Sequence, residues 1–331
     1  MYKLSLVQKE YKVLDVMKFV MAIVVVAIHT RPEMSFSSPF VIRLFESVYS
    51  IAVPFFFMAS GFLLFRKISL PLNEEGEQRI KSYLKRMCRL YLVWTIIYLP
   101  LTIYGFYIDG LSPLKAIVVF FRNTLLVGEN FMSWPLWYLL ALIVAVSIIY
   151  ILMKFKVSQT WIVIISVLMA FVGVGVNYCH DHELLNPLVD IYFKVFKNTR
   201  NGFFVGFLFV ALGLLCTKLD KISGFVLGTI LIVGILGIVF NCPLSNAAVT
   251  FALFVSTVSR IGRFVSSGVS VSMRRMSTII YFTHMLLVAP LRLFIDLKLG
   301  FFLFLIVSIS MIIVALCLLL SQNKFYRILF T

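Results

Sequence analysis

Charged side chains are scarce in this 331-residue chain, and acidic side chains are scarcer than basic ones. Only 13% of the residues are charged, with 14 Asp and Glu against 30 Lys and Arg, while 61% are hydrophobic. The mean hydropathy is +1.02, whereas a water-soluble domain of this length has a far more polar composition. The composition therefore excludes a soluble globular protein and predicts an all-α, polytopic membrane protein.

The signature motifs of several enzyme classes are also missing. The chain has no P-loop, no G-x-G-x-x-G and no G-x-S-x-G sequence, so nucleotide hydrolysis and serine-hydrolase chemistry find no support. Its five cysteines are scattered without C-x-x-C spacing. The net charge of +16 comes without a basic soluble module, so we expect no nucleic-acid partner and no metal.

Ten apolar runs are long enough to be candidates for membrane-spanning helices. Most lysines and arginines fall in alternate connecting segments, and the richest of these segments is residues 66–89. Because basic residues concentrate on the cytoplasmic side of membrane proteins, both termini are predicted to be cytoplasmic. We expect residues 1–331 to form a single helical domain in the lipid bilayer, with about ten spans at residues 13–28, 48–65, 90–108, 135–153, 160–178, 202–217, 222–240, 245–259, 278–295 and 299–320.

The first apolar run contains three ionisable side chains, Asp15, Lys18 and His29. A charge near the centre of a spanning helix costs roughly 2.5–3.5 kcal/mol, so such residues usually face a bundle interior or a wet cavity. Lys18 and His29 are eleven residues apart, which puts them about 20° apart around a helix axis. Asp15 lies one turn before Lys18, so all three side chains share one face.

This shared face predicts a polar passage, with Ala22 and Val25 also on its wall and Val20 and Ile23 turned away. A neutral imidazole beside a wet passage is able to take a proton from a hydroxyl near pH 7, so His29 is a candidate general base. The alternative is that Lys18 anchors the helix at the headgroups and His29 merely caps its other end.

Arg86 and Arg89 lie at i, i+3 before the third predicted span, so they are neighbours on a helix surface. Arginine forks match phosphate oxygens, and such a pair is suited to a pyrophosphate. From spacing alone, an ordinary basic cluster at the cytoplasmic end of a span explains the pair at least as well.

Four further side chains are candidates for binding a substrate. Trp137 belongs to "SWPLWYL" at the start of the fourth span, where the aromatic belt of a membrane protein is an equally good explanation. Arg200 in "NTRNGFF" is placed to meet an anionic or sugar ligand from outside. Tyr281 and His284 continue a polar stripe on the ninth span.

Two outer segments carry other patterns. "CHDHE" places Cys179, His180 and His182 in a predicted loop, where a solvated loop is the preferred interpretation and a metal site the alternative. Lys115 and Arg122 bracket a run that we expect to form an amphipathic helix on the membrane surface.

With these residues in their order, the chain resembles the acyltransferase-3 family of integral membrane acyltransferases. The family's first span has a basic residue, ten others and then histidine, matched by Lys18 and His29. Its Arg-x-x-Arg is matched by Arg86 and Arg89. "VPFFFMASGFLL", "LWYL", "GFFVGFLFVALG" and "STIIYFTH" are similar to further family stretches. "NTRNGFF" and "VPFFFM" also resemble the membrane domain of the vancomycin-resistance serine racemases.

The family resemblance implies an O-acyltransferase in the bacterial cytoplasmic membrane. The donor would be acyl-coenzyme A, most simply acetyl-coenzyme A, and the acceptor a hydroxyl of an envelope glycan or another small molecule. His29 would deprotonate the acceptor, Lys18 with Asp15 beside it would stabilise the donor, and Arg86 with Arg89 would hold its phosphates. Many family members have arginine in place of Lys18, and lysine lacks the bidentate fork.

The resemblance to the racemases leaves a second function open. In that interpretation the chain is a transporter-like domain for a small polar solute such as serine. The histidine and the Arg-x-x-Arg favour the enzyme, since a transporter needs no site for coenzyme A. The sequence does not name the acyl group, the acceptor or the oligomeric state.

Overall fold

A computed structural model describes residues 11–219, 222–259, 265–292, 294–320 and 329–330. This described part is helical and contains no strand. Its elements are α1 Lys12–Thr30, η1 Pro32–Ser35, α2 Pro39–Phe65, α3 Glu74–Ile108, α4 Pro113–Arg122, η2 Asn123–Val127, η3 Trp134–Leu136, α5 Trp137–Lys154, α6 Gln159–Asp181, α7 Asn186–Phe196, η4 Gly202–Gly206, α8 Phe207–Cys216, α9 Gly224–Val239, α10 Ser245–Ser259, α11 Ser267–Leu291, η5 Leu297–Leu299 and α12 Gly300–Leu320.

Six helices within these ranges are long and apolar enough to cross a membrane, which confirms a multi-pass helical membrane protein. They are α1, α2, α3, α6, α12 and the continuous segment Trp134–Lys154 that contains α5. Within the described residues each of the ten predicted segments overlaps a helix, but three of the other four lie on helices of 10–17 residues, and α11 is not among the six. A total of about ten spans and the cytoplasmic termini stay predictions.

Several helices extend well beyond their apolar runs. The helix α3 begins at Glu74 rather than near Leu90, because Asn73 caps it by accepting a hydrogen bond from Gly76 N and three acidic residues occupy its first turn. Ser266 caps α11 in the same way, through Val269 N. Both helices therefore continue beyond their apolar regions, and their arginines lie on these additional turns. Hydropathy alone does not predict this extension.

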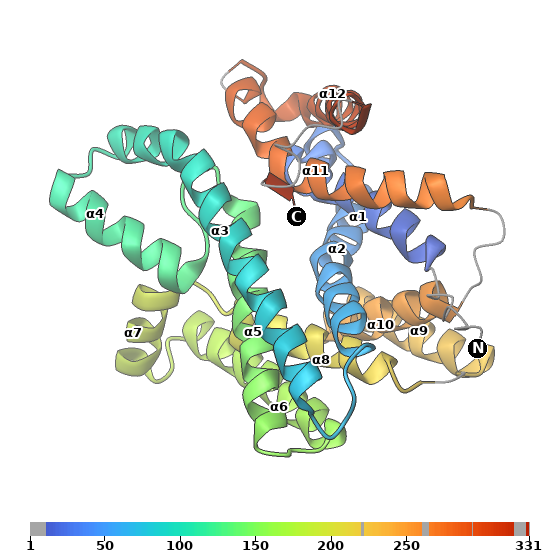
Figure 1. Cartoon of the computed structure of the whole chain (residues 1–331). Helices are drawn as coiled ribbons and strands as arrows, with labels where there is room; N and C mark the ends of the chain where they lie inside the picture. Colours follow the sequence, from blue (N-terminus) through green and yellow to red (C-terminus); the bar gives the residue numbers. More distant parts are fainter. Residues whose placement is uncertain (1–10, 220–221, 260–264, 293, 321–328, 331) are drawn as a thin grey trace.

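The predicted outer segments also fold as helices. The expected loop at Cys179 and His180 is the last turn of α6, and His182 caps it, stacking on Tyr178 with ring centroids 4.0 Å apart. That correction follows from the lack of a glycine or proline in the segment. The expected surface helix is α4, and α7 lies beside it (Figure 1), joined by a hydrogen bond from Arg122 to Lys194 O of 3.2 Å.

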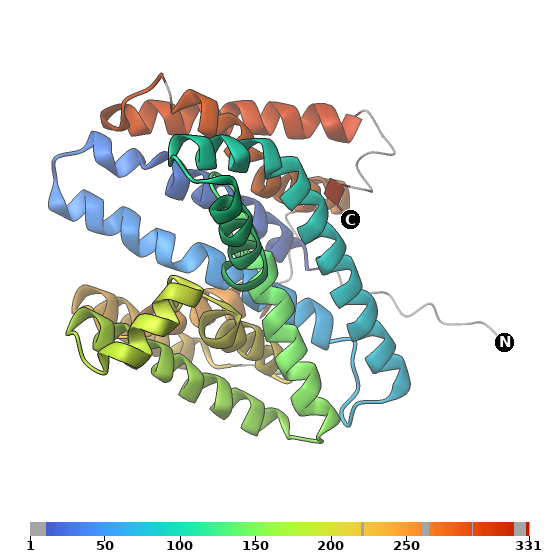
Figure 2. The same cartoon turned by 90° about the vertical axis from the view of Figure 1, so that its left-hand side faces the viewer.

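The helices α1, α2 and α11 form the centre of the molecule, with α12 packed across α1 and α11 (Figures 1 and 2). The helix α2 approaches α8 so closely that a Cβ at Gly61 would collide with the carbonyl oxygen of Val210. The small residues in the middle of "VPFFFMASGFLLF" thus serve helix packing, as expected for membrane helices. The helix α3 packs against α5, and residues of α3, α1 and α2 line the cavity described below.

Candidate functional site

A cavity of about 1780 Å³ opens between α1, α2, α3, α5 and α11. Its lining comes from the beginning of α1, the end of α2, the first half of α3 and the beginning of α11, so it enters the bundle from the end at which those helix termini meet. We call this the cavity end. Basic side chains dominate the charged lining, which among the described residues comprises Lys18, Arg66, Lys67, Arg79, Arg86, Arg274 and Arg275 against Asp15 and Glu75.

Asp15 and Lys18 both line this cavity, as their spacing predicted. Asp15 is buried, accepts a hydrogen bond of 2.7 Å from Ser270 Oγ and lies 3.7 Å from Arg274 Nη1. Lys18 makes no ion pair with a described residue. The carboxylate of Asp15 is therefore paired with side chains of α11 and not with Lys18.

Arg86 and Arg89 have different surroundings although they lie on the same helix. Arg86 lines the cavity, with its guanidinium 5.3 Å from the ring centroid of Tyr83. Arg89 is exposed and does not belong to the described lining. Only one of the two predicted phosphate ligands is thus brought to the cavity, together with Arg274 and Lys18 from other helices.

The cavity ends at a group of aromatic residues halfway along the helices. Tyr281 lies here and donates a hydrogen bond of 2.6 Å to Pro135 O. Tyr138 lies beside it, 2.8 Å from Ser60 Oγ. One turn beyond Tyr281 on α11 is His284, whose ring centroid lies 6.5 Å from that of Tyr281.

His284 is fully buried and contacts His29 at the other end of α1, with ring centroids 5.3 Å apart. Its Nδ1 lies 2.9 Å from Ile280 O, and because a carbonyl only accepts, Nδ1 carries the hydrogen. The lone pair is then on Nε2, which has no partner in the described structure. Buried polar atoms are normally paired, so this orphan acceptor indicates a site for a hydrogen-bond donor.

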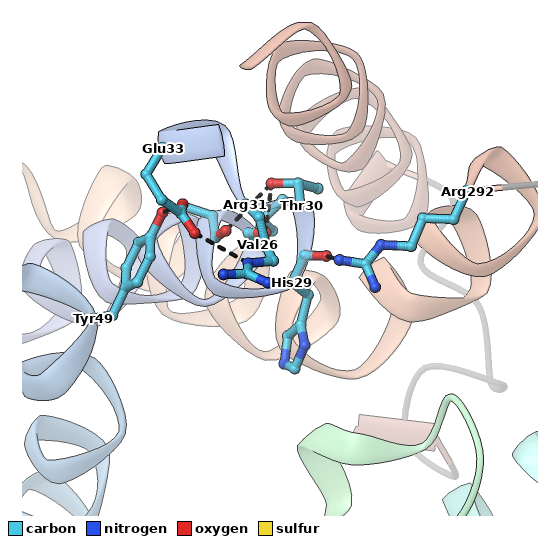
Figure 3. A network of polar contacts seen from close by, with 8 residues as sticks. Val26, His29, Thr30, Arg31, Glu33, Tyr49 and Arg292 are labelled. Atoms are coloured by element: carbon cyan, nitrogen blue, oxygen red, sulfur yellow. Dashed lines mark hydrogen bonds and ion pairs between the residues drawn. The ribbon is translucent and has the colours of Figure 1, made fainter. Parts of the chain in front are cut away.

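His29 itself is held between two aromatic rings and a fixed backbone. Its imidazole stacks on Trp134, with ring centroids 5.8 Å apart, and the Arg292 guanidinium lies 5.9 Å from the centroid of the same tryptophan ring. Its carbonyl oxygen accepts a hydrogen bond of 2.6 Å from Arg292 Nη2 (Figure 3). The last carbonyls of a helix lack partners within the helix, so a guanidinium here both satisfies one and complements the helix dipole.

The turn after His29 is anchored as well (Figure 3). Arg31 adopts a left-handed conformation with φ 55°, and its Nε donates to Glu33 Oε1 at 3.2 Å. The other oxygen of Glu33 accepts from Tyr49 OH on α2 at 2.6 Å. On the opposite side, Gly300 at the start of α12 packs so closely that a Cβ would collide with Arg31 O. Three helices therefore fix the end of α1, and we call this region the His29 end.

Arg200 and Trp137, both predicted from sequence, are brought together near the start of α5. The Arg200 guanidinium lies 5.0 Å from the Trp137 ring centroid and 3.7 Å from the carboxylate of Glu129. Burial raises the pKa of Glu129, and the charge of Arg200 opposes that shift. Burial also lowers the pKa of Lys197, at the end of α7. The π-helical turns η2 and η4 flank this cluster, and such turns are frequent at functional sites.

The predicted stripe along α1 is not a continuous passage. Ala22 and Val25 are 0% and 2% exposed and do not line the cavity, in a helix that packs closely against α11 and α2. Val20, which was expected to face away, is 43% exposed. Trp134, Arg292 and Glu129 were missed by the sequence interpretation, although the arginine and the tryptophan were visible as polar or aromatic residues beside predicted spans. Their relation to His29 depends on contacts between distant segments.

Comparison with known proteins identifies the family to which the chain belongs. The sequence model of the acyltransferase domain, acyltransferase-3, matches residues 11–320. A protein of Enterococcus faecalis named amino-acid racemase is 29% identical over 235 residues, which cover 69% of this chain and 32% of the relative. A serine/alanine racemase of Enterococcus gallinarum is 30% identical over 210 residues, 62% of this chain and 29% of the relative.

The match to these racemases thus spans about a third of their length. No solved structure matches the chain. The family match, in contrast, includes α1 with His29, α3 with Arg86 and α11 with His284, so both ends of the site lie inside the family domain. The chain therefore belongs to the acyltransferase-3 family.

Proposed function

We propose that the chain is a membrane O-acyltransferase that transfers an acyl group, most simply acetyl, from acyl-coenzyme A to a hydroxyl of an envelope glycan or another small acceptor. One observation carries this proposal. The helices α1 and α11 border a basic cavity at one end and hold the enclosed pair His29 and His284 at the other. Membership of the family supports acyl transfer.

The cavity end suits a donor with several phosphates. Coenzyme A is polyanionic, and arginine and lysine side chains bind phosphate through charge-assisted hydrogen bonds. Lys18, Arg86 and Arg274 come from three helices, so they surround the cavity instead of forming a flat patch. The volume of about 1780 Å³ exceeds the ~300–1,000 Å³ usual for drug-sized ligands, as a nucleotide with a long pantetheine arm requires.

In the proposed reaction His29 is the general base. Its imidazole takes the proton of the acceptor hydroxyl while the hydroxyl oxygen attacks the carbonyl carbon of the thioester. The new C–O bond forms, the C–S bond breaks, and the departing thiolate recovers the proton from the imidazolium. The orphan Nε2 of His284 accepts a hydrogen bond from the acceptor or from protonated His29, and Trp137 with Arg200 lines the approach of the acceptor.

In this proposal the cavity opens to the cytoplasm of a bacterium, where the donor is made, and the His29 end lies toward the outer face of the cytoplasmic membrane. The basic residues around the cavity support that orientation through the positive-inside tendency. The acceptor then meets the acyl group within the bundle.

The proposal is tested with purified protein in proteoliposomes, radiolabelled acetyl-coenzyme A and a panel of isolated envelope glycans and small alcohols. We expect ester formation by the wild type, and none by His29→Ala or His29→Gln. Glutamine keeps the volume and hydrogen bonding but accepts no proton at neutral pH. Near-normal transfer by the His29→Gln variant would rule out base catalysis at this residue.

A second function, the binding and transport of a small polar solute such as serine, is favoured by the similarity to the racemases. The same proteoliposomes separate the two functions when radiolabelled serine is added outside. Uptake that depends on His29, with no transfer from acetyl-coenzyme A, would replace the acyltransferase proposal by the transporter.

A further inference from the structure

Three aromatic rings close the inner limit of the cavity. Phe56, Tyr138 and Tyr281 all line it. Their ring centroids lie 5.6 to 6.3 Å apart in all three pairs, at angles of 62° to 65°. Such edge-to-face contacts are favourable for aromatic pairs, so the three rings form a continuous wall.

His29 and His284 lie beyond this wall. Tyr281 is the member next to His284, at 6.5 Å between ring centroids, and His284 in turn contacts His29. Neither histidine lines the cavity, and Ala22 and Val25, which precede His29 on α1, are at most 2% exposed and do not line it either. A group that starts in the cavity therefore meets the aromatic wall before it meets either histidine.

The three rings differ in how firmly they are held. The Tyr281 hydroxyl is bonded to Pro135 O at 2.6 Å, and the Tyr138 hydroxyl lies 2.8 Å from Ser60 Oγ and 3.3 Å from Phe56 O. The phenyl ring of Phe56 has no polar anchor. It also follows Pro54, which removes a helical hydrogen bond from α2. Phe56 is thus the ring that is able to turn at least cost.

We infer that Phe56, Tyr138 and Tyr281 form an aromatic gate between the donor cavity and His29, and that Phe56 limits the size of the acyl group that passes. The inference rests on the proposed acyl transfer for its substrate. The reacting carbon and oxygen must come within about 3–3.5 Å of each other, so the acyl carbon has to pass the rings. A two-carbon acyl group needs only a rotation of Phe56, whereas longer chains need the other two rings to leave their hydrogen bonds.

The barrier itself is tested by thiol access, which does not depend on acyl transfer. In a background with the five native cysteines replaced, His284→Cys reports on the far side of the gate. Thr278→Cys, which lines the cavity and is partly exposed, reports on the near side. A membrane-impermeant thiol reagent is added to inside-out vesicles. We expect rapid labelling of Thr278→Cys and slow labelling of His284→Cys.

When Phe56→Ala is added to each cysteine variant, the labelling rate of His284→Cys should rise by about tenfold or more. The labelling rate of Thr278→Cys should stay unchanged. Phe55→Ala is the matched control, because Phe55 is the adjacent phenylalanine, is fully buried against Phe254 and does not line the cavity. Equal labelling rates of the two cysteine variants when Phe56 is intact would overturn the gate. Equal changes of the His284→Cys labelling rate with Phe55→Ala and with Phe56→Ala would also overturn it.

The size limit is tested with acetyl-, butyryl- and hexanoyl-coenzyme A. We expect the wild type to prefer acetyl, and Phe56→Ala to reduce the acetyl-to-butyryl ratio of kcat/KM by about tenfold or more, a change within the usual range for pocket discrimination. An unchanged ratio would overturn the size limit. Absence of transfer from every thioester, with the thiol-access result as expected, would refute the proposed function and leave the barrier established.

Discussion

The two ends of the α1–α11 pair place their polar side chains in opposite environments. At the cavity end Lys18, Arg86 and Arg274 border open space and have few partners. At the His29 end the imidazole stacks on Trp134 and contacts His284, and the backbone carbonyl of His29 accepts a hydrogen bond from Arg292. The cavity end is thus built to attract a charged ligand, and the His29 end to keep one reactive group in a fixed position.

This difference determines how each end should respond to substitution. Binding by several charges that face solvent is shared, so each charge contributes modestly. Chemistry depends on geometry, and a misplacement of about 1 Å can cost roughly a hundredfold in rate. Substitutions at the His29 end should therefore lower kcat, and substitutions at the cavity end should raise the KM for the donor.

Among the substitutions that test this difference between the two ends, Gly300→Ala should have the largest effect on the rate of acyl transfer. The added Cβ would collide with Arg31 O, so the turn after His29 must shift. We expect kcat for acyl transfer to fall by about a hundredfold, with an unchanged KM for the donor. Gly228→Ala in α9 is the control, since nothing lies within 4 Å of its Cβ. Equal rates for the two variants would show that the position of this turn does not matter for transfer.

A somewhat smaller loss is expected from Arg292→Gln. The substitution removes the guanidinium that donates to the carbonyl of His29, a charge-assisted bond of about 1.5–3 kcal/mol. We expect kcat to fall about 10–100-fold, with partial recovery in Arg292→Lys, which keeps the charge at the helix terminus. The measurement is kcat and donor KM, with the exposed Arg43→Gln as the control. A rise in donor KM alone would place Arg292 in donor binding and not in the positioning of His29.

At the cavity end, the variants Arg86→Gln and Arg89→Gln compare two arginines of the same helix, α3. Arg86 lines the cavity and Arg89 does not. Because Arg86 is exposed to solvent, we expect only about a tenfold rise in donor KM, with kcat nearly unchanged. Arg89→Gln should change neither constant by more than about twofold. Equal effects would restore the Arg-x-x-Arg pair as a joint phosphate site.

The sequence alone was sufficient to predict the helical membrane class, the family and which residues share a face of one helix. Asp15 and Lys18 share the cavity because helical spacing alone puts them on one face. Spacing did not show that Ala22 and Val25 would be buried by neighbouring helices, so the passage predicted along α1 is interrupted there. Packing between distant segments decides which parts of a polar stripe meet open space.

The same limit explains the residues that were missed. Arg292 is 263 residues away from the carbonyl that it binds, and its position at the edge of an apolar run only marked it as costly in a membrane. Trp134 looked like one more aromatic belt residue. Their role is set by the tertiary arrangement of α1, α5 and α11, which composition and periodicity do not contain.

The smallest effect is expected from Glu129 and concerns stability. Its side chain is 16% exposed and lies 3.7 Å from Arg200, and burial raises its pKa in the folded protein. A raised pKa means that the folded state prefers the protonated carboxyl. The stabilisation is therefore complete below the ordinary value of 4.5 and is lost as the pH rises through the raised value. Relative to Glu129→Gln, the wild type should lose stability over this pH interval, which is measured as a small fall in Tm in detergent. In Arg200→Gln, which removes the opposing charge, the fall should occur at higher pH. Parallel pH profiles for the wild type and Glu129→Gln would mean that this carboxyl is equally ionised in the folded and unfolded states.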